Sequence, residues 1–185
     1  MLIEEYVTLL TDRLRSVEES EENREPETAE WTQYEFPFNP DSISIPDTVV
    51  IETDVGNFTV LLWGNTAPVT CSSFWHLAGT GFYDSVYFHR VIPGFVAQAG
   101  CPEGVGTGGP GYLLPNERST RHFGRGVLGM ADAGLNTGGS QFFIMLDDHG
   151  RLDGRYTAFG TVLNKDELDR ITVGTQIRDV VCLVN

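Results

Sequence analysis

Several features that mark particular protein classes are missing from this sequence of 185 residues. No apolar run reaches the about 20 residues that a helix needs to cross a membrane. The opening stretch, "MLIEEYVTLL", has no basic segment and meets acidic residues at once, so it does not resemble a secretory signal. Lysine is nearly absent, with Lys165 alone against eleven arginines, and no basic stripe is present. Nucleic-acid binding through phosphates is therefore disfavoured.

Cysteine and histidine are too few and too scattered to predict a metal site. Cys71, Cys101 and Cys182 are odd in number and far apart, and no CxxC pair occurs. The four histidines show neither HxxxH nor HxH spacing. Zinc sites usually need such closely spaced ligands, so we expect no metal and no cofactor. Unpaired cysteines favour reduced thiols, which predicts a cytoplasmic location.

Two further enzyme classes are disfavoured by the surroundings of their motifs. Residues 104–109, "GVGTGG", match the dinucleotide-binding pattern GxGxxG, but Pro110 and Gly111 follow where a helix would have to begin. We therefore interpret these residues as a turn-rich loop. No G-x-S-x-G elbow occurs, and Ser140 precedes a run that is typical of a strand, so a serine hydrolase is not indicated either.

The distribution of charge divides the chain into two parts. Residues 1–30 contain ten acidic residues and three arginines, which is half of the net charge of −14. We predict an N-terminal extension over residues 1–46: an amphipathic helix near 2–17, an acidic linker over 18–30 and an aromatic segment over 31–38 that packs on the main domain. Two interpretations of the helix stay open. It packs on its own domain or frays, or it docks on a partner or on a second copy of this chain.

The remaining residues, 47–185, have the pattern of a domain rich in strands. Two alternating runs surround residues 54–57, which predicts a hairpin. Thr66 is the expected N-cap of a helix with Pro68 in its first turn, and Gly79 and Gly81 are typical of its end. Many antiparallel strands with only two helices predict a closed β-barrel with helices at its ends. We expect the second helix at residues 165–172 and further strands at residues 86–92, 95–99, 126–131, 140–146, 156–163 and 177–184.

One predicted hairpin, "VYFHRVIPGFVAQAG" at residues 86–100, contains polar side chains where a core is expected. Pro93 and Gly94 separate two apolar runs, yet the first contains His89 and Arg90 and the second contains Gln98. Arginine is almost never buried without a partner. Because successive strand residues face opposite sides, we expect Arg90 on one face and His89 on the other, as a buried, hydrogen-bonded structural residue.

Five segments together carry a pattern that is more specific than any single motif. They are "FHRVIPGFVAQAG" (88–100), "GTGGPGY" (106–112), "NE" (116–117), "GVLGMADAGLNTGGSQFFIML" (126–146) and "LDGRYTAFGTV" (152–162). In order and spacing they resemble the cyclophilins, a family of peptidyl-prolyl cis-trans isomerases, over residues 47–184. The resemblance implies a closed eight-stranded antiparallel β-barrel capped by two α-helices. It also implies an enzyme that rotates Xaa-Pro peptide bonds without a cofactor.

The same resemblance implies the residues of an active site. Arg90 matches the arginine that donates a hydrogen bond to the prolyl nitrogen. Gln98 matches the glutamine that holds the substrate backbone and helps to orient that arginine. Proline-containing peptides or client proteins are the expected partners. The other matches form an apolar slot for the proline ring and the groove beside it: Phe95, Val96, Ala131, Asp132, Phe143, Leu152 and Tyr156.

This sequence departs from the family pattern at four positions. Val96 replaces a commoner methionine, which predicts a slightly wider slot, and Asp132 replaces an asparagine. Tyr156 stands where many members have histidine. Arg151 stands where members sensitive to cyclosporin have tryptophan. We expect weak cyclosporin binding, because a large flat apolar contact and an indole donor are lost.

Two functions from different classes follow from this sequence. The first is an active prolyl isomerase that assists protein folding, because Arg90, Phe95, Gln98 and Phe143 are all present. The second is a cyclophilin-fold module that binds proline-containing peptides with little turnover and serves as a scaffold. The isomerase reaction needs no general base, so we expect its rate not to follow the titration of a histidine.

Overall fold

The computed structural model describes residues 35–40 and 48–183. The predicted helix near residues 2–17, the acidic linker over 18–30 and the domain boundary at residues 46 and 47 lie outside the described residues. Within the described part, no helix is both long enough and apolar enough to span a lipid bilayer.

The first hairpin consists of β1 (Thr48–Thr53) and β2 (Gly56–Leu62), as the alternating pattern predicts. Every second side chain of β1 is buried, and Ile51 lies opposite Phe58 in the register. Thr53 Oγ1 donates to the carbonyl of Gly56 and accepts from the amide of Val55, which fixes the turn. The hairpin therefore presents one apolar face to the core.

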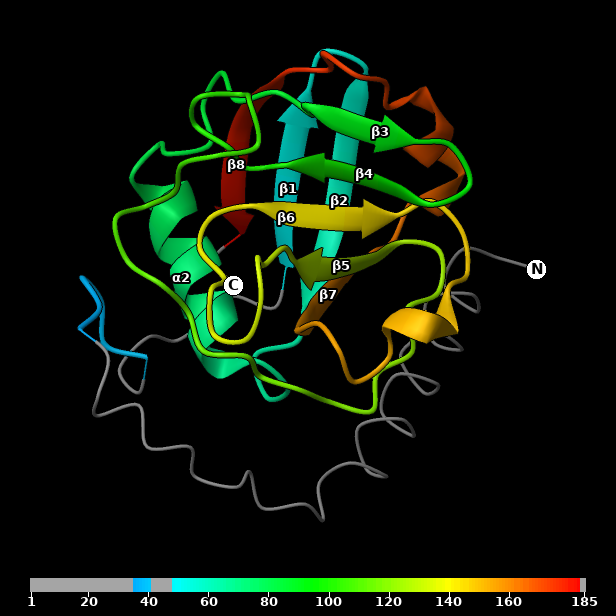
Figure 1. Ribbon diagram of the computed structural model, residues 1–185. Coiled ribbons are helices and arrows are strands. Elements are labelled where there is room, and N and C mark those ends of the chain that lie inside the picture. Colours follow the sequence, from blue (N-terminus) through cyan, green and yellow to red (C-terminus); the bar gives the residue numbers. More distant parts are fainter. Residues whose placement is uncertain (1–34, 41–47, 184–185) are drawn as a thin grey trace. The chain divides into compact units, whose positions relative to one another are not determined.

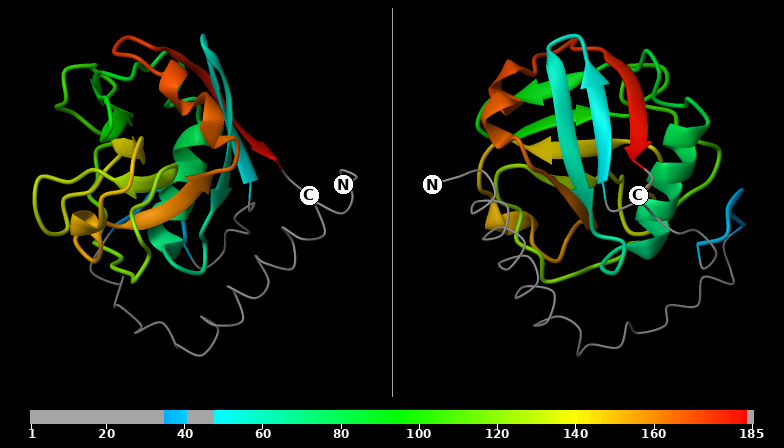
Figure 2. Two further views of the ribbon diagram at one scale, coloured as in Figure 1. Left: turned by 90° about the vertical axis from the view of Figure 1, so that its right-hand side faces the viewer. Right: turned by 180° about the vertical axis from the view of Figure 1, so that it is seen from behind.

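Eight strands form one antiparallel sheet that curls around the core (Figures 1 and 2). The order across the sheet is β3-β4-β6-β5-β7-β2-β1-β8. The strands that follow the first hairpin along the chain are β3 (Arg90–Ile92), β4 (Val96–Ala99), β5 (Val127–Met130), β6 (Phe142–Met145), β7 (Ala158–Val162) and β8 (Ile177–Leu183).

The two end strands, β3 and β8, are linked through the segments that precede them. Tyr87 and Gln176 form an isolated antiparallel bridge, and the amide of Ile177 donates to the carbonyl of Val86 at 2.8 Å. Over residues 48–183, no continuous ladder joins β3 to β8. The sheet is thus a curled half-barrel, and its full closure stays a prediction.

Helix α2 (Pro68–Gly79) is capped by a distant side chain and not by its neighbours in the sequence. Pro68 stands in the first turn, as predicted, but the N-cap residue is Ala67, so the expectation that Thr66 caps the helix is wrong. The carboxylate of Glu117 accepts from the amides of Val69 and Thr70 at 2.9 and 2.8 Å. Since the first amides of a helix have no partner within it, this carboxylate takes over the role of the cap.

Two short 3₁₀ helices complete the described structure: η2 (Gly150–Leu152) and η3 (Lys165–Arg170). The second confirms the helix predicted over residues 165–172, but it is a 3₁₀ helix and not the α-helix that the family resemblance implies. Asn164 precedes η3 and binds β2 through the amide of Thr59 and the carbonyl of Asn57, and the chain is already extended at Ile171.

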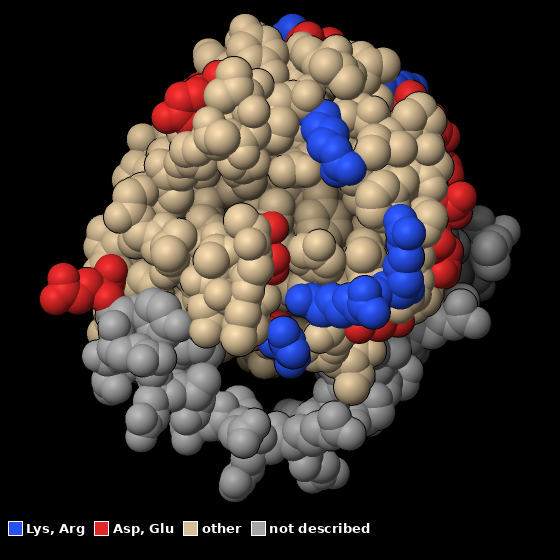
Figure 3. Space-filling view, in the orientation of Figure 1, with Lys and Arg blue, Asp and Glu red and all other residues tan. Residues whose placement is uncertain are grey.

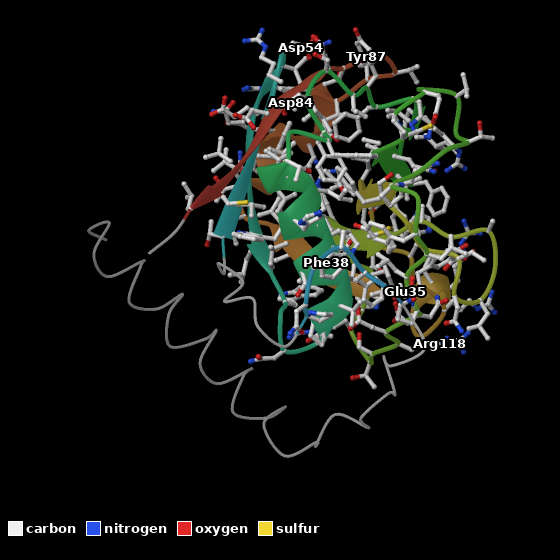
Figure 4. The ribbon with its side chains drawn as sticks, turned by 90° about the vertical axis from the view of Figure 1, so that its left-hand side faces the viewer. Glu35, Phe38, Asp54, Asp84, Tyr87 and Arg118 are labelled. Atoms are coloured by element: carbon white, nitrogen blue, oxygen red, sulfur yellow. The ribbon has the colours of Figure 1, made fainter. Side chains whose placement is uncertain are left out.

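Aromatic side chains join α2 to the sheet. Phe74 of α2 packs against Tyr83, Phe142 and Phe159, with ring centroids 5.1 to 5.5 Å apart. Phe38, from the predicted aromatic segment, lies beside α2 (Figure 4), where it contacts the rings of His76 and Tyr112. The described part of that segment therefore packs on the domain, and residues 31–34 lie outside the described part.

Candidate active site

The candidate site is built on the β3–β4 hairpin, and its turn follows directly from the sequence. The amide of Phe95 donates to the carbonyl of Ile92 at 3.0 Å, and Gly94 has a φ of 68°. Proline followed by glycine at the centre of a turn is the signature of type II geometry, which requires a positive φ at the second position. The turn fixes the register and places Arg90 opposite Gln98.

A chain of hydrogen bonds holds the exposed Arg90 in place. Its Nη1 donates to Oε1 of Gln98 at 3.3 Å, and Nε2 of Gln98 donates to Oε1 of Gln141 at 3.1 Å. Nε2 of Gln141 then donates to the carbonyls of Gly106 and Gly108. The orientation of the guanidinium is thereby tied to the glycine-rich loop.

Gln141 is a candidate site residue that the sequence prediction did not include. It lies just before β6, two positions from Phe143, and residues two apart in a strand share a face. Phe143 was predicted as a slot residue, so this period of two was the available signal. The structure therefore adds Gln141 to the groove.

The residues predicted for the proline slot come together in one apolar cluster. The buried residues of the cluster include Val96, Phe143 and Leu152. Phe95, Ala131 and Tyr156 are partly buried and pack against it. Phe123, Met145 and other buried side chains form its floor, and the sequence prediction did not include them. The rings of Phe143 and Tyr156 meet edge to face, with centroids 5.6 Å apart.

Space for the Phe143 ring comes from a residue without a side chain. A Cβ atom on Gly129 of β5 would lie 2.3 Å from Cζ of Phe143 and 2.7 Å from Cε1 of Phe123. Such distances are shorter than any real carbon contact, so only glycine permits the two rings to pack there. The backbone of β5 thus sets the position of Phe143.

Two histidines hold the rim that carries Leu152. Nε2 of His149 lies 2.7 Å from the carbonyl of Gly94, and its ring meets that of Phe95 edge to face at 4.9 Å. His122 lies between two carboxylates, with Nε2 2.7 Å from Asp148 and Nδ1 2.8 Å from Asp153. Hydrogen bonds to Asp153 and Asp148 raise the pKa of His122 to about 9, so the ring is an imidazolium at neutral pH.

The opposite edge of the groove is formed by Ala131 and Asp132. The amide of Ala131 donates to the carbonyl of Gln141 at 2.9 Å. Asp132 replaces the family asparagine, and both of its oxygens are engaged: Nδ2 of Asn116 donates to Oδ2 at 3.2 Å, and the amide of Gly134 donates to Oδ1 at 3.2 Å. The carboxylate is therefore held in the loop.

Two open pockets flank the site. One, of about 770 Å³, is lined by Gln98, Ala131, Gln141 and the glycine-rich loop. The other, of about 470 Å³, is lined by Phe95, Leu152 and Tyr156 together with charged side chains. Asp132 lines both pockets. The face drawn in Figure 3 is hollowed, and Lys and Arg side chains stand beside the hollow.

The prediction for His89 is only partly correct. Its side chain is half-buried, whereas Arg90 is exposed, so the two residues differ as the strand pattern requires. However, Nδ1 of His89 is buried without a well-formed hydrogen bond in the described structure, and the ring faces the loop at Gly106. Burial lowers its pKa, which keeps the ring neutral. The backbone of Tyr87 lies near the ring and opposes the effect of burial on its pKa.

The chemistry of the site is that of hydrogen-bond donation beside an apolar slot. The hydroxyl of Ser140 is buried and donates to the carbonyl of Gly100 at 2.7 Å, so it is not available as a nucleophile. Among the residues described, no three side chains of His, Cys, Asp and Glu are arranged to hold a metal ion. A cation at Arg90, oriented amides and a slot of aromatic rings suit the binding of a small apolar ring with its backbone.

Comparison with known proteins gives one consistent picture. The chain matches the family described as "Cyclophilin type peptidyl-prolyl cis-trans isomerase/CLD" over residues 48–182. A peptidyl-prolyl cis-trans isomerase of Synechococcus elongatus is 48% identical over 119 residues, which are 64% of this chain and 82% of that protein. Peptidyl-prolyl cis-trans isomerase B of Bacillus subtilis is 52% identical over 103 residues, 55% of this chain and 72% of that protein.

Solved structures agree. A cyclophilin type peptidyl-prolyl cis-trans isomerase of Cryptosporidium parvum superposes with a TM-score of 0.71 at 30% identity, covering 76% of this chain and 99% of that chain. A second structure of that protein, obtained in the presence of the dipeptide Ala-Pro, has a TM-score of 0.70 at 30% identity and covers 75% of this chain and 99% of that one.

Proposed function

This chain belongs to the cyclophilin-type peptidyl-prolyl cis-trans isomerase family, and from this premise we propose how its own residues catalyse rotation about Xaa-Pro bonds. Arg90 is the donor that stabilises the twisted amide. Gln98 and Gln141 orient it, and the cluster around Phe143 binds the proline ring.

The reaction breaks no bond, so catalysis must act on amide resonance. Rotation about a peptide bond meets a barrier of about 18–20 kcal/mol, because the partial double bond is lost in the twisted state. In that state the prolyl nitrogen regains a lone pair. A donor that reaches this nitrogen binds the transition state more tightly than either planar isomer, and such differential binding is catalysis.

Arginine suits this role because its guanidinium is charged at every relevant pH and has several fixed donors. A hydrogen bond from a charged donor contributes about 1.5–3 kcal/mol, which corresponds to about ten- to hundredfold in rate. The observation that carries the proposal is the anchoring of Arg90 by Gln98, on the strand that also pairs with Phe143. β4 therefore joins the strand of the donor to the strand of Phe143.

Replacement of Arg90 tests the proposal. In an NMR exchange assay on an Xaa-Pro peptide, we expect Arg90→Ala to lower kcat/KM about ten- to hundredfold with little change in peptide affinity. Arg90→Lys keeps the charge but loses the planar donors, so its kcat/KM should lie between those of wild type and Arg90→Ala. Arg178→Ala, an exposed arginine on β8, is the matched control and should behave as wild type.

The second candidate function, a peptide-binding scaffold with little turnover, makes the opposite prediction. Wild type and Arg90→Ala would then bind the peptide equally, and neither would accelerate exchange. Equal acceleration by both proteins would instead remove Arg90 from the mechanism.

Further expectations accompany this function. Arg151 lies over the ring of Phe95, with 4.9 Å from its Cζ to the ring centroid, and it offers no indole to cyclosporin. We therefore propose weak cyclosporin binding. We also propose that residues 1–30 dock on a partner or self-associate, which the mass in solution would test. Hydrogen exchange would test the closed barrel. Cell fractionation would test a cytoplasmic location with reduced Cys71, Cys101 and Cys182.

A further inference from the structure

Three arginines meet at the smaller pocket beside the proline slot. Arg118, Arg151 and Arg155 line it together with Phe95 and Tyr156 of the slot cluster. All three arginine side chains are exposed. Arg118 stands at the end of the molecule opposite Tyr87 (Figure 4). Because Phe95 and Tyr156 line this pocket and also belong to the slot cluster, the pocket is continuous with the place where a proline ring would lie.

These guanidinium groups are not occupied by the protein's own acids. Within residues 35–40 and 48–183, the ion pairs are those of His122, Arg125 and Arg170, and none involves Arg118, Arg151 or Arg155. In the part of the chain that the structure describes, the side chain of Arg151 stacks on the Phe95 ring and forms no ion pair.

The charge of the pocket is opposite to that of the chain. Three arginines face one carboxylate, Asp132, whose two oxygens already accept from Asn116 and Gly134. The whole sequence carries a net charge of −14. Charges further away than the Debye length of about 8 Å are largely screened at physiological salt. A ligand in this pocket therefore experiences mainly the local positive charge.

We propose that this arginine pocket selects substrates, so that the preferred clients have Asp or Glu within one or two residues of the proline. The inference rests on the proposed isomerase function and specifies its substrate class. A carboxylate matches the planar donors of arginine, and one extended residue spans about 3.3 Å. Cζ of Arg151 lies 4.9 Å from the centroid of the Phe95 ring, so a carboxylate one or two residues from a proline at that ring can reach the guanidinium.

A proline-containing peptide fits these observations better than a nucleic acid does. The pocket opens onto the apolar slot through Phe95, Leu152 and Tyr156, and an extended peptide can fill both at once. A long polyanion would instead lie along a chain with twenty-six acidic and twelve basic residues.

The test uses three peptides that differ at the residues flanking one proline: Ala, Glu or Lys. NMR exchange gives kcat/KM for each peptide without a coupling protease. Exposed ion pairs are individually weak, so we expect two or three of them to favour the Glu peptide over the Lys peptide about three- to tenfold. The preference should fall below about twofold near 1 M salt, where the Debye length is about 3 Å.

Variants then assign the preference to the pocket. Arg118→Gln with Arg155→Gln should bring the Glu-to-Lys ratio close to one, and Arg118→Glu with Arg155→Glu should reverse it. The matched control, Arg178→Gln, changes the net charge on a distant strand and should keep the wild-type ratio. A wild-type protein that treats the Glu and Lys peptides alike at low salt would overturn the inference.

The outcomes also separate this inference from the function on which it rests. Turnover of the Ala peptide without a charge preference refutes only the arginine pocket. No turnover of any peptide refutes the isomerase function, and peptide affinities from NMR titration then decide the charge preference by themselves. Displacement of the Glu peptide by a short oligonucleotide, but not by an acidic peptide without proline, would overturn the choice of a peptide ligand.

Discussion

Replacement of Gly129 by alanine tests whether the proline slot depends on the close packing of two rings against β5. The new Cβ would lie 2.3 Å from Cζ of Phe143, whereas ordinary contact begins at 3.4 Å, so the ring must retreat by about 1.1 Å (3.4 minus 2.3). The ring has little freedom to do so. It is only 6% exposed and lies between Phe123 and Tyr156, with centroids at 5.8 and 5.6 Å.

The expected cost follows from overpacking. Forcing an extra carbon into a filled core destabilises a protein by about 1–3 kcal/mol. At about 2–4 °C per kcal/mol for a domain of this size, the Tm should fall by about 2–12 °C. A ring displaced by about 1 Å also misplaces the substrate, for which losses of about a hundredfold are known. We therefore expect kcat/KM to fall about ten- to hundredfold.

Calorimetry and the exchange assay measure both effects on the same sample. Gly79→Ala is the matched control, because it adds the same carbon at the end of α2, where nothing lies within 4 Å. That variant should keep its activity, and its Tm should hold or rise slightly, because alanine favours a helix over glycine. If Gly129→Ala retained wild-type rate and Tm, the assignment of slot geometry to β5 would be refuted.

Two other predictions concern the supports of the site. Two carboxylates raise the pKa of His122 from an ordinary 6.5 to about 9, so the stability that the imidazolium contributes is fully present below about pH 6.5 and is lost as the pH rises through about 9. The Tm difference between wild type and His122→Gln should therefore shrink between pH 6.5 and 9. A Tm difference that stays constant over this range would contradict the prediction. Glu117→Gln leaves the buried amides of Val69 and Thr70 without full partners, so the free energy of unfolding measured in urea should fall by about 1–3 kcal/mol. The control Asp179→Asn, at an exposed position, should change it very little. Equal losses in the two variants would refute the capping role of Glu117.

The part of the site that the sequence predicted is the part that depends on local geometry. Pro93 and Gly94 specify the turn, the turn specifies the register, and the register places Arg90 beside Gln98. Alternation alone separates the exposed Arg90 from the half-buried His89. The assignment of Phe143 and Leu152 to a substrate slot came from the family resemblance, because periodicity cannot distinguish a groove wall from a core.

The parts that were missed depend on contacts between distant segments. Gln141 belongs to the chain of hydrogen bonds that holds Arg90, and it lies forty-three residues from Gln98 in the sequence. Glu117 caps α2 and lies forty-seven residues from Thr70. No local pattern contains either pairing, although the period of two from Phe143 does place Gln141 on the same face. A helix was predicted over residues 165–172 and is present at Lys165–Arg170, but no local pattern in the sequence predicted its 3₁₀ form.

The order of strands in the sheet has a consequence for how this domain is made. β1 pairs on one side with β2, its neighbour in the chain, and on the other with β8, where Thr48 meets Leu183. On a ribosome the first hairpin forms early, but its outer edge has no partner until β8 emerges. Such long-range pairing folds slowly, and an unpaired edge is a template for aggregation. Pairing of β8 with β1 is therefore the step that protects the nascent chain. A product truncated before Ile177 would leave the outer edge of β1 open to pairing with other molecules.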